Sequence, residues 1–289
     1  MLTRLDHIAI AVHDLAAAQR STIALLGRTP CWQAGHPEHG VRSVIFRLKN
    51  TCIELRAAES AGARAEVLES RLEAAGEGLF GLALESEDIE ETRLELEKHG
   101  FSLGAPALGL SQDGPSGAWR RFKTLDLPQE ETGGIRLSIV EHLSLPEELP
   151  PSLPIGDESG AIDALDHVVV ITQDADRARS LYGDRLGIRL SLDKSFEERR
   201  SRILFFRLGG ATIEVGASLD PPAEPAPDQL WGLAYQVGNI DLARDRITEA
   251  GFDVTDVRSG FKPDTRVCTV KSGTHGVATL LIEPRTPLR

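Results

Sequence analysis

The stretch Leu5-Asp6-His7-Ile8-Ala9-Ile10-Ala11-Val12 is an apolar, β-rich run that carries a histidine near its start. Its beginning returns 160 positions later as Leu165-Asp166-His167-Val168. The same interval separates Cys52-Ile53-Glu54-Leu55 from Thr212-Ile213-Glu214-Val215. Self-similarity at a fixed interval is typical of a duplicated architecture. The chain therefore contains two related halves, each with a histidine and a glutamate at matching strand positions.

Residues 3–57 predict a strand, a helix and three further strands. Asp14 is expected to cap a helix that runs from Leu15 to about Leu26, and Gly27 is expected to end it. The dipeptide Lys49-Asn50 predicts a tight turn between the last two strands, at 42–48 and 51–56. A charge-rich helix at 59–75 is then expected to lead to the next unit.

A second unit is predicted from residue 79 to 141, with a helix at 88–99 and strands at 79–85, 101–103, 119–125 and 135–141. We interpret 109–117, which contains Gly, Ser and Pro, as a loop. The segment Gly81-Leu82-Ala83 returns 151 positions later as Gly232-Leu233-Ala234. The predicted fold class is α+β, with four βαβββ units paired into two tandem half-open barrel domains.

Composition indicates the domain boundaries and excludes some classes of function. The domains are expected at 1–144 and 163–289, joined by a proline-rich linker at 145–162. A net charge of −12 argues against nucleic-acid binding, which needs a basic surface. No apolar run approaches the length that spans a membrane, and three unpaired cysteines suit a reducing compartment. We therefore expect a cytoplasmic protein with a small-molecule ligand; the sequence leaves a homodimer open.

These motifs resemble those of the vicinal oxygen chelate superfamily, which includes glyoxalases, extradiol dioxygenases and bleomycin-resistance proteins. The resemblance covers nearly the whole chain. It is carried by the repeated Leu-Asp-His strands and by two further segments, Phe46-Arg47-Leu48 leading to Ile53-Glu54-Leu55 and Phe206-Arg207-Leu208 leading to Ile213-Glu214-Val215. It implies a cleft lined by strand residues and, in the enzymes, one divalent metal per active cleft.

The resemblance assigns metal-ligand positions to both halves. In the first half it implies His7 and Glu54 as ligands of Fe, Mn, Zn or Ni. In the second half it implies a possible second site at His167 and Glu214. The corresponding first-strand positions of the paired units are Gly81 and Gly232, which cannot ligate a metal.

The register of the last strand decides the third ligand. One register turns Ser138 and Leu280 into the cleft, and a shift by an odd number of residues turns Glu141 or Glu283 inward instead. His142 is a further candidate ligand. Glu54 and Glu141 are the candidate catalytic carboxylates.

Several other side chains are candidate substrate contacts. Arg42 and Arg47 are five residues apart and so face opposite sides of a strand, which lets one of them bind an anionic group. Trp119 and Arg121 form another candidate set, and His36 and His39 lie in a loop at the expected mouth of the cleft. We interpret His275 as a turn residue.

Two functions from different classes follow. The first is a metal-dependent lyase, isomerase or dioxygenase acting on a small, oxygen-rich, anionic substrate chelated through adjacent oxygens. The second is a metal-free binding protein of the antibiotic-resistance type, which Gly81 and Gly232 favour. A scaffold or regulatory protein that kept the fold without the chemistry is a third alternative.

Overall fold

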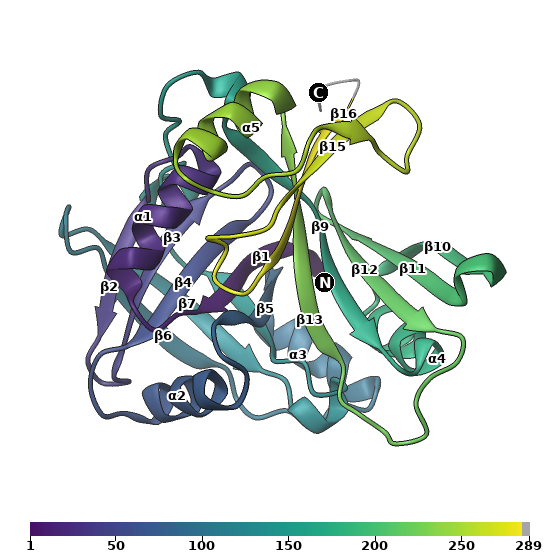
Figure 1. The fold of residues 1–289 in the computed structure, drawn as a ribbon. Helices are drawn as coiled ribbons and strands as arrows, with labels where there is room; N and C mark the ends of the chain where they lie inside the picture. The colour runs from purple at the N-terminus through teal and green to yellow at the C-terminus, as the bar shows by residue number, and fades with distance from the viewer. Residues whose placement is uncertain (285–289) are drawn as a thin grey trace.

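The computed structural model describes residues 1–284 and contains two eight-stranded sheets (Figure 1). The first sheet has the strand order β2-β3-β4-β1-β5-β8-β7-β6. Its elements are β1 (Leu2–Ala11), α1 (Leu15–Leu26), β2 (Trp32–His36), β3 (Val41–Arg47), β4 (Cys52–Ala58), α2 (Ala63–Ala75), β5 (Gly78–Ser86), α3 (Ile89–Lys98), β6 (Ala107–Gln112), β7 (Trp119–Asp126) and β8 (Leu137–His142).

The second sheet repeats the plan, with the order β10-β11-β12-β9-β13-β16-β15-β14. Its elements are β9 (Ile162–Thr172), α4 (Ala175–Arg179), β10 (Arg189–Phe196), β11 (Ser201–Leu208), β12 (Ala211–Ser218), β13 (Gln229–Val237), α5 (Ile240–Glu249), β14 (Arg258–Ser259), β15 (Thr265–Val270) and β16 (Ala278–Pro284). The prediction of two tandem domains with the α+β fold is confirmed. The expected C-terminal boundary at residue 289 lies outside the described residues.

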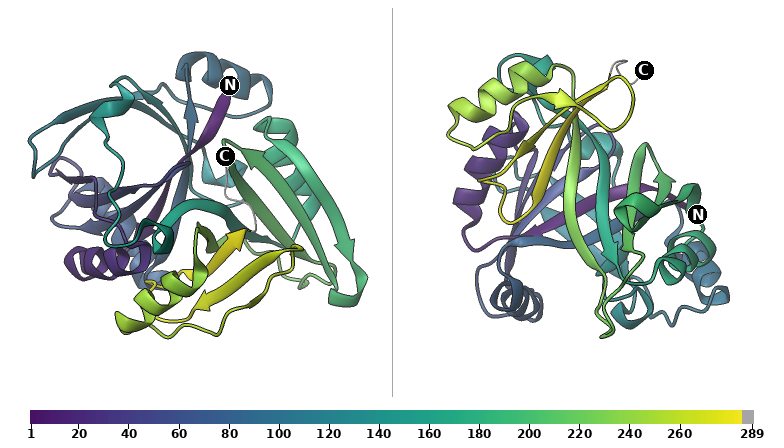
Figure 2. Two further views of the ribbon diagram at one scale, coloured as in Figure 1. Left: turned by 90° about the horizontal axis from the view of Figure 1, so that it is seen from above. Right: turned by 45° about the vertical axis from the view of Figure 1, so that its right-hand side comes forward.

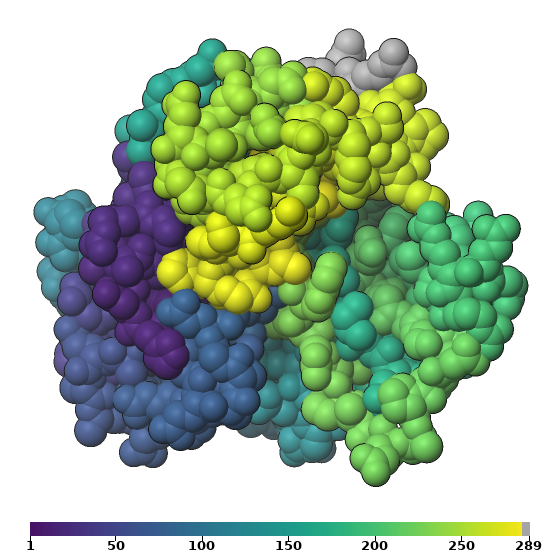
Figure 3. All heavy atoms as spheres, viewed as in Figure 1, coloured from purple at the N-terminus to yellow at the C-terminus, as the bar shows by residue number. Residues whose placement is uncertain are grey.

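The first sheet curls until its two edge strands meet. Trp32 on β2 donates its indole N–H to Ser111 on β6 over 2.9 Å, and the Gln33 backbone N–H donates to Asp113 over 2.8 Å. The second sheet stays more open, and Figure 2 shows this difference between the purple-to-teal and the green-to-yellow parts. The space-filling view shows a hollow between the β10–β12 region and the yellow strands (Figure 3).

Helix α1 begins and ends where the sequence predicts. The Asp14 carboxylate accepts from the Ala17 backbone N–H over 2.9 Å, and Gly27 ends the helix in the left-handed conformation at φ 64°. The apolar face of α1 packs on the outer face of the first sheet. The inner face of that sheet is left to line a cavity.

Two elements differ from the prediction. Residues 101–103 form no strand; Phe101 is buried instead, directly after α3. Part of the predicted loop forms β6, which pairs with β7 through Ala107–Gln112. A Cβ at Gly109 would lie 2.3 Å from the Phe122 ring, so this glycine allows close strand packing and does not mark a turn.

Polar contacts join the two halves. Asn50, in the predicted turn between β3 and β4, exchanges two hydrogen bonds with the backbone of Leu165 on β9. Buried Arg28 donates to the Ile162 carbonyl over 2.5 Å and pairs with Asp163 over 2.7 Å. One continuous apolar core contains residues of both sheets. No helix within residues 1–284 is long and apolar enough to cross a membrane.

Candidate functional site

A cavity of about 200 Å³ lies inside the first sheet. Helix α2 closes one end of it with Arg64, Val67 and Leu68, and Leu149 of the segment after β8 also lines it. The wall contains Val41, Ile45, Phe80, Leu82, Phe122 and Val140 beside several charged side chains. An apolar wall with a few polar groups is typical of a site for a small organic molecule.

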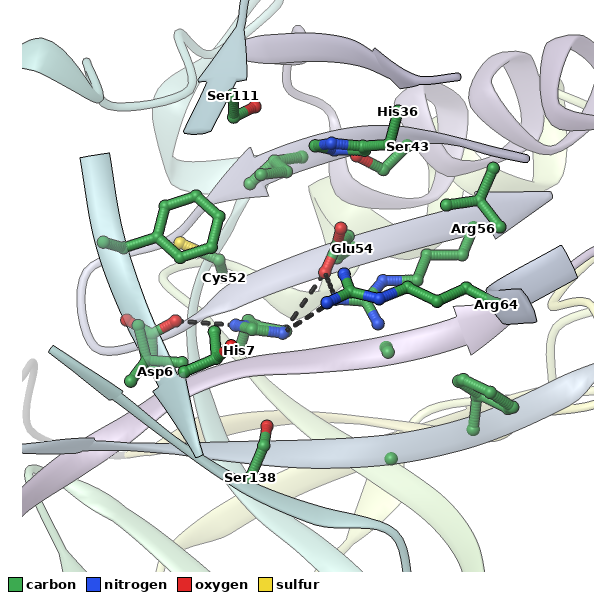
Figure 4. A pocket seen from close by; sticks show the side chains of 18 of the residues that line it. Asp6, His7, His36, Ser43, Cys52, Glu54, Arg56, Arg64, Ser111 and Ser138 are labelled. Atoms are coloured by element: carbon green, nitrogen blue, oxygen red, sulfur yellow. Dashed lines mark hydrogen bonds and ion pairs between the residues drawn. The ribbon is translucent and has the colours of Figure 1, made fainter. Parts of the chain in front are cut away.

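The histidine and glutamate predicted from the repeat do meet in this cavity. The Nε2 atom of His7 lies 3.2 Å from Oε2 of Glu54, which is 6% exposed. Figure 4 shows both side chains directed toward each other from β1 and β4. In the second half, Nε2 of His167 lies 3.6 Å from Oε2 of Glu214.

Asp6 lines the cavity beside His7, although neighbours in a strand normally face opposite sides. The pairing of β1 with β5 is irregular between Leu5 and His7, and such a bulge turns both side chains inward. Asp6 accepts from Nδ1 of His7 and from Nε2 of His142, each over 2.6 Å. Burial alone would raise the pKa of Asp6, but these two hydrogen bonds outweigh it and hold that pKa well below its usual range.

Arg56 completes the contacts around Glu54. Its Nη2 atom donates to Oε2 of Glu54 over 2.7 Å and lies 3.3 Å from Nε2 of His7. Burial would raise the pKa of Glu54, but the charges of Arg56 and then His7 outweigh it and lower that pKa to about 2. Arg56 lies two residues after Glu54 on β4 and therefore faces the same side.

The register of β8 decides which of the other predicted side chains of the first half line the cavity and which face away from it. Ser138 and His142 line the cavity, together with Val140, so the even-numbered residues of β8 face inward. Glu141 faces the opposite side, where it accepts from the Ile89 backbone N–H over 3.1 Å and pairs with Lys123. The structure therefore does not bring Glu141 to the predicted metal position.

Glu283 behaves in the same way in the second half. It accepts from the Ile240 backbone N–H over 2.7 Å and pairs with Arg266, away from His167. Asp166 takes the place of Asp6 here and accepts from His167, Gln236 and Lys262.

Most of the predicted substrate contacts lie outside the cavity. Arg42 is exposed beside Glu59, and Arg47 donates to the carbonyls of Pro146 and Leu149. Trp119 is 55% exposed, and Arg121 and His39 do not line the cavity. His36 does line it, and burial lowers its pKa.

Sequence reasoning missed five charged residues of the cavity: Asp6, Arg56, Arg64, Asp126 and Arg136. Arg120, which the sequence offered with Arg121 as an anion contact, does line the cavity; it is buried and donates to Nδ1 of His142 over 3.3 Å. The repeated Leu-Asp-His motif could have indicated Asp6, and strand alternation from Glu54 could have indicated Arg56.

Two groups of residues bear on metal binding. At His7 and Glu54 a metal does not fit, because the guanidinium of Arg56 contacts both ligand atoms. Separately, Asp6, Glu85 and His142 have ligand atoms that all lie within 4.8 Å of one another, the one such group of three or more among the described residues. Each carboxylate of that group is already paired, since Asp6 contacts two histidines and Glu85 contacts Arg4.

Comparison with known proteins identifies the family. Residues 5–153 match a family described as a glyoxalase-like domain, and residues 166–269 match the Glyoxalase/Bleomycin resistance protein/Dioxygenase superfamily. The first match spans more than half of the chain. The chain therefore belongs to this superfamily and contains two glyoxalase-like domains.

Individual relatives include enzymes. The ethylmalonyl-CoA/methylmalonyl-CoA epimerase of Cereibacter sphaeroides is 36% identical over 113 residues, which is 38% of this chain and 82% of the epimerase. A mutant 4-hydroxymandelate synthase from Streptomyces coelicolor has a TM-score of 0.70 at 17% identity, over 98% of this chain and 92% of the synthase. The Mn(II)-bound glyoxalase from Novosphingobium aromaticivorans has a TM-score of 0.63 at 14% identity, over 99% of this chain and 83% of the glyoxalase. The two structural likenesses show a shared fold.

Proposed function

We propose that the N-terminal cavity binds a small organic anion that carries more than one oxygen, with no divalent metal at His7 and Glu54. This is the metal-free alternative predicted from the sequence, with an anionic ligand. The observation that carries it is Arg64, a charged side chain of the cavity that makes no hydrogen bond or ion pair to any described residue.

The charges of the cavity support an anion. Four arginines line it against three carboxylates, so it has an excess of positive charge in a chain whose net charge is −12. They are Arg56, Arg64, Arg120 and Arg136 against Asp6, Glu54 and Asp126. A local cationic cluster attracts anions even when the whole protein is acidic.

The closed hydrogen-bond network favours binding over acid–base chemistry. The Nδ1 and Nε2 atoms of His7 contact Asp6 and Arg56, and those of His142 contact Arg120 and Asp6. Neither imidazole therefore has a ring nitrogen free to accept a proton from a ligand. The Ser138 and Thr124 side chains, which also line the cavity, remain available to a ligand oxygen.

Calorimetric titration of the full chain with acetate, malonate, methylmalonate and inorganic phosphate tests this proposal. We expect at least one carboxylate to bind, and Arg64→Gln to weaken that binding by about tenfold or more, because a charged hydrogen bond is lost. Arg42→Gln is the matched control, since Arg42 is exposed and lies outside the cavity. Equal losses in both variants, or no binding of any of these anions, would contradict the proposal.

A metal-dependent lyase or isomerase is the second candidate, favoured by the proximity of Asp6, Glu85 and His142. A bound Fe, Mn, Zn or Ni ion would polarise a carbonyl oxygen of the substrate as a Lewis acid. Elemental analysis of protein purified without chelators tests it. About one metal ion per chain, lost in both His142→Ala and Glu85→Gln but retained in Glu54→Gln, would favour this function over the first.

A further inference from the structure

We propose that the guanidinium of Arg56 occupies the cation position between His7 and Glu54, so that this glyoxalase-like domain uses an arginine where a metal-binding domain of the same fold holds a divalent ion. The role of Arg56 as a contact for the ligand rests on the proposed function. Its place as the resident cation rests on geometry alone.

His7 and Glu54 are spaced like two ligands of one metal ion, and the Arg56 guanidinium lies where that ion would be. Two ligand atoms of one metal ion lie about 3 Å apart when each is about 2 Å from the metal. The His7 Nε2 and Glu54 Oε2 atoms are 3.2 Å apart, and Nη2 of Arg56 contacts both, at 3.3 and 2.7 Å. A guanidinium stays protonated in proteins, so this positive charge depends neither on pH nor on metal supply.

Arg56 is kept in position by its place on β4 and by its ion pair with the buried Glu54. Burial would lower the pKa of Arg56, but the Glu54 carboxylate outweighs that effect and raises it. Each residue thus stabilises the charged form of the other. Without Arg56, Glu54 would be a buried carboxylate with His7 as its remaining hydrogen-bonding or ion-pair contact, and such a loss is strongly destabilising.

The second half of the chain provides an internal comparison. His167 and Glu214 repeat the pair at 3.6 Å, but the residue two positions after Glu214 is Gly216. Among residues 1–284, no guanidinium contacts both atoms of that pair. The two halves therefore differ at the one position that supplies the cation in the first half.

The remaining donors of Arg56 are available to a ligand. Its Nε and Nη1 atoms have no hydrogen-bond partner among residues 1–284, and Arg64 enters the same cavity from α2. Figure 4 shows both side chains extending toward the His7–Glu54 pair. Nη2 is already used by Glu54 and His7, so Nε and Nη1 can each donate one charged hydrogen bond to a ligand oxygen. We therefore assign the ligand class as a carboxylate whose oxygen contacts Arg56.

The test gives the first half the residue that the second half has at the equivalent position. Arg56→Gly should lower the melting temperature, and Mn(II), Zn(II) or Ni(II) should then raise it, because an ion that binds the folded state stabilises it. Adding Glu54→Gln should abolish the response to the ions. Arg136→Gly is the matched control: it removes a cavity guanidinium that contacts neither His7 nor Glu54, and it should gain no response.

Arg56→Lys keeps the experiment informative if Arg56→Gly does not fold. It should stay folded, show no response to the ions that depends on Glu54, and bind the carboxylate about tenfold more weakly, because the hydrogen bonds from Nε and Nη1 are lost. Wild-type protein with a divalent-ion response that Glu54→Gln removes would overturn the inference. So would a folded Arg56→Gly variant that ignores all three ions. No carboxylate binding by the wild type, or equal losses in Arg64→Gln and Arg42→Gln, would contradict the proposed function and leave this result unchanged.

Discussion

Glu141 and Glu283 hold equivalent positions, one residue before the end of β8 and of β16, and each accepts a hydrogen bond from the first backbone N–H of a helix. The partners are Ile89 of α3 and Ile240 of α5. Unpaired N–H groups at a helix start need an acceptor, and a carboxylate is favoured there by the helix dipole. These glutamates therefore connect each helix to the last strand of its sheet.

Glu141→Ala should cost about 1–2 kcal/mol in the free energy of unfolding, because the acceptor for Ile89 is lost. Ligand affinity should stay unchanged, since Glu141 faces away from the cavity. Urea unfolding and calorimetric titration of the same variant measure both quantities. A variant with unchanged free energy of unfolding but weaker ligand binding would contradict this and would place Glu141 in the site, as the sequence predicted.

The buried Glu54 carboxylate should make the stability depend on acid. Its pKa in the folded chain is about 2, below the ordinary 4.5, so its stabilising effect is complete above about pH 4.5 and is lost as the pH falls toward 2. The full loss is on the order of 3 kcal/mol. Glu54→Gln should flatten the dependence measured by urea unfolding between pH 6 and 3. An unchanged slope would show that other groups cause it.

Asp6→Asn should be more harmful than Asp166→Asn. Asp6 receives hydrogen bonds from two imidazoles, and an amide can accept only one of them and must turn its NH₂ group to the other. We expect a loss of about 2–4 kcal/mol at position 6. Asp166 accepts from a single imidazole, that of His167, and from Gln236 and Lys262, so it should tolerate the change better. Equal losses in urea unfolding would argue against a special role for the two-histidine bridge.

The repeat made the fold predictable, and strand alternation predicted part of the site. His7 and Glu54 were found because each occurs twice at the same interval. Asp6 was not, because the bulge that turns it inward depends on the pairing of β1 with β5, which the sequence does not encode locally. Arg64 was missed because its place depends on how α2 packs across the end of the barrel.

The register of β8 shows the same limit. Alternation left two choices, with Ser138 or Glu141 inward, and each was compatible with the pattern of apolar residues. In the structure, β8 pairs with β5 in the register that turns Ser138 inward, and Glu141 accepts from the first backbone N–H of α3 on the other side. The strand β6 was missed for a local reason, since Gly109 was counted as part of a loop although it makes room for Phe122.

A polar chain of three residues connects the two halves at some distance from the cavity. Nε2 of His275, in the turn before β16, lies 2.5 Å from Oγ of Ser21 on α1, and its Nδ1 lies 2.7 Å from Oε2 of Glu77. The Glu77 carboxylate also accepts from the His13 backbone N–H over 2.8 Å. His275 was predicted to be a turn residue, and its φ of 51° agrees with a turn. Its side chain also joins the domains.

His275→Ala should therefore lower the free energy of unfolding by about 1–2 kcal/mol, through the loss of two hydrogen bonds that span the domains. Gly276→Ala should be worse, because its φ is 74° and a Cβ there would lie 2.2 Å from the Glu77 carbonyl. His99→Ala, at the exposed end of α3, is the control and should be nearly neutral. Urea unfolding followed by hydrogen exchange at α1 measures the effect. If His275→Ala matched the control and left exchange at α1 unchanged, the contact would contribute nothing to the docking of the two halves.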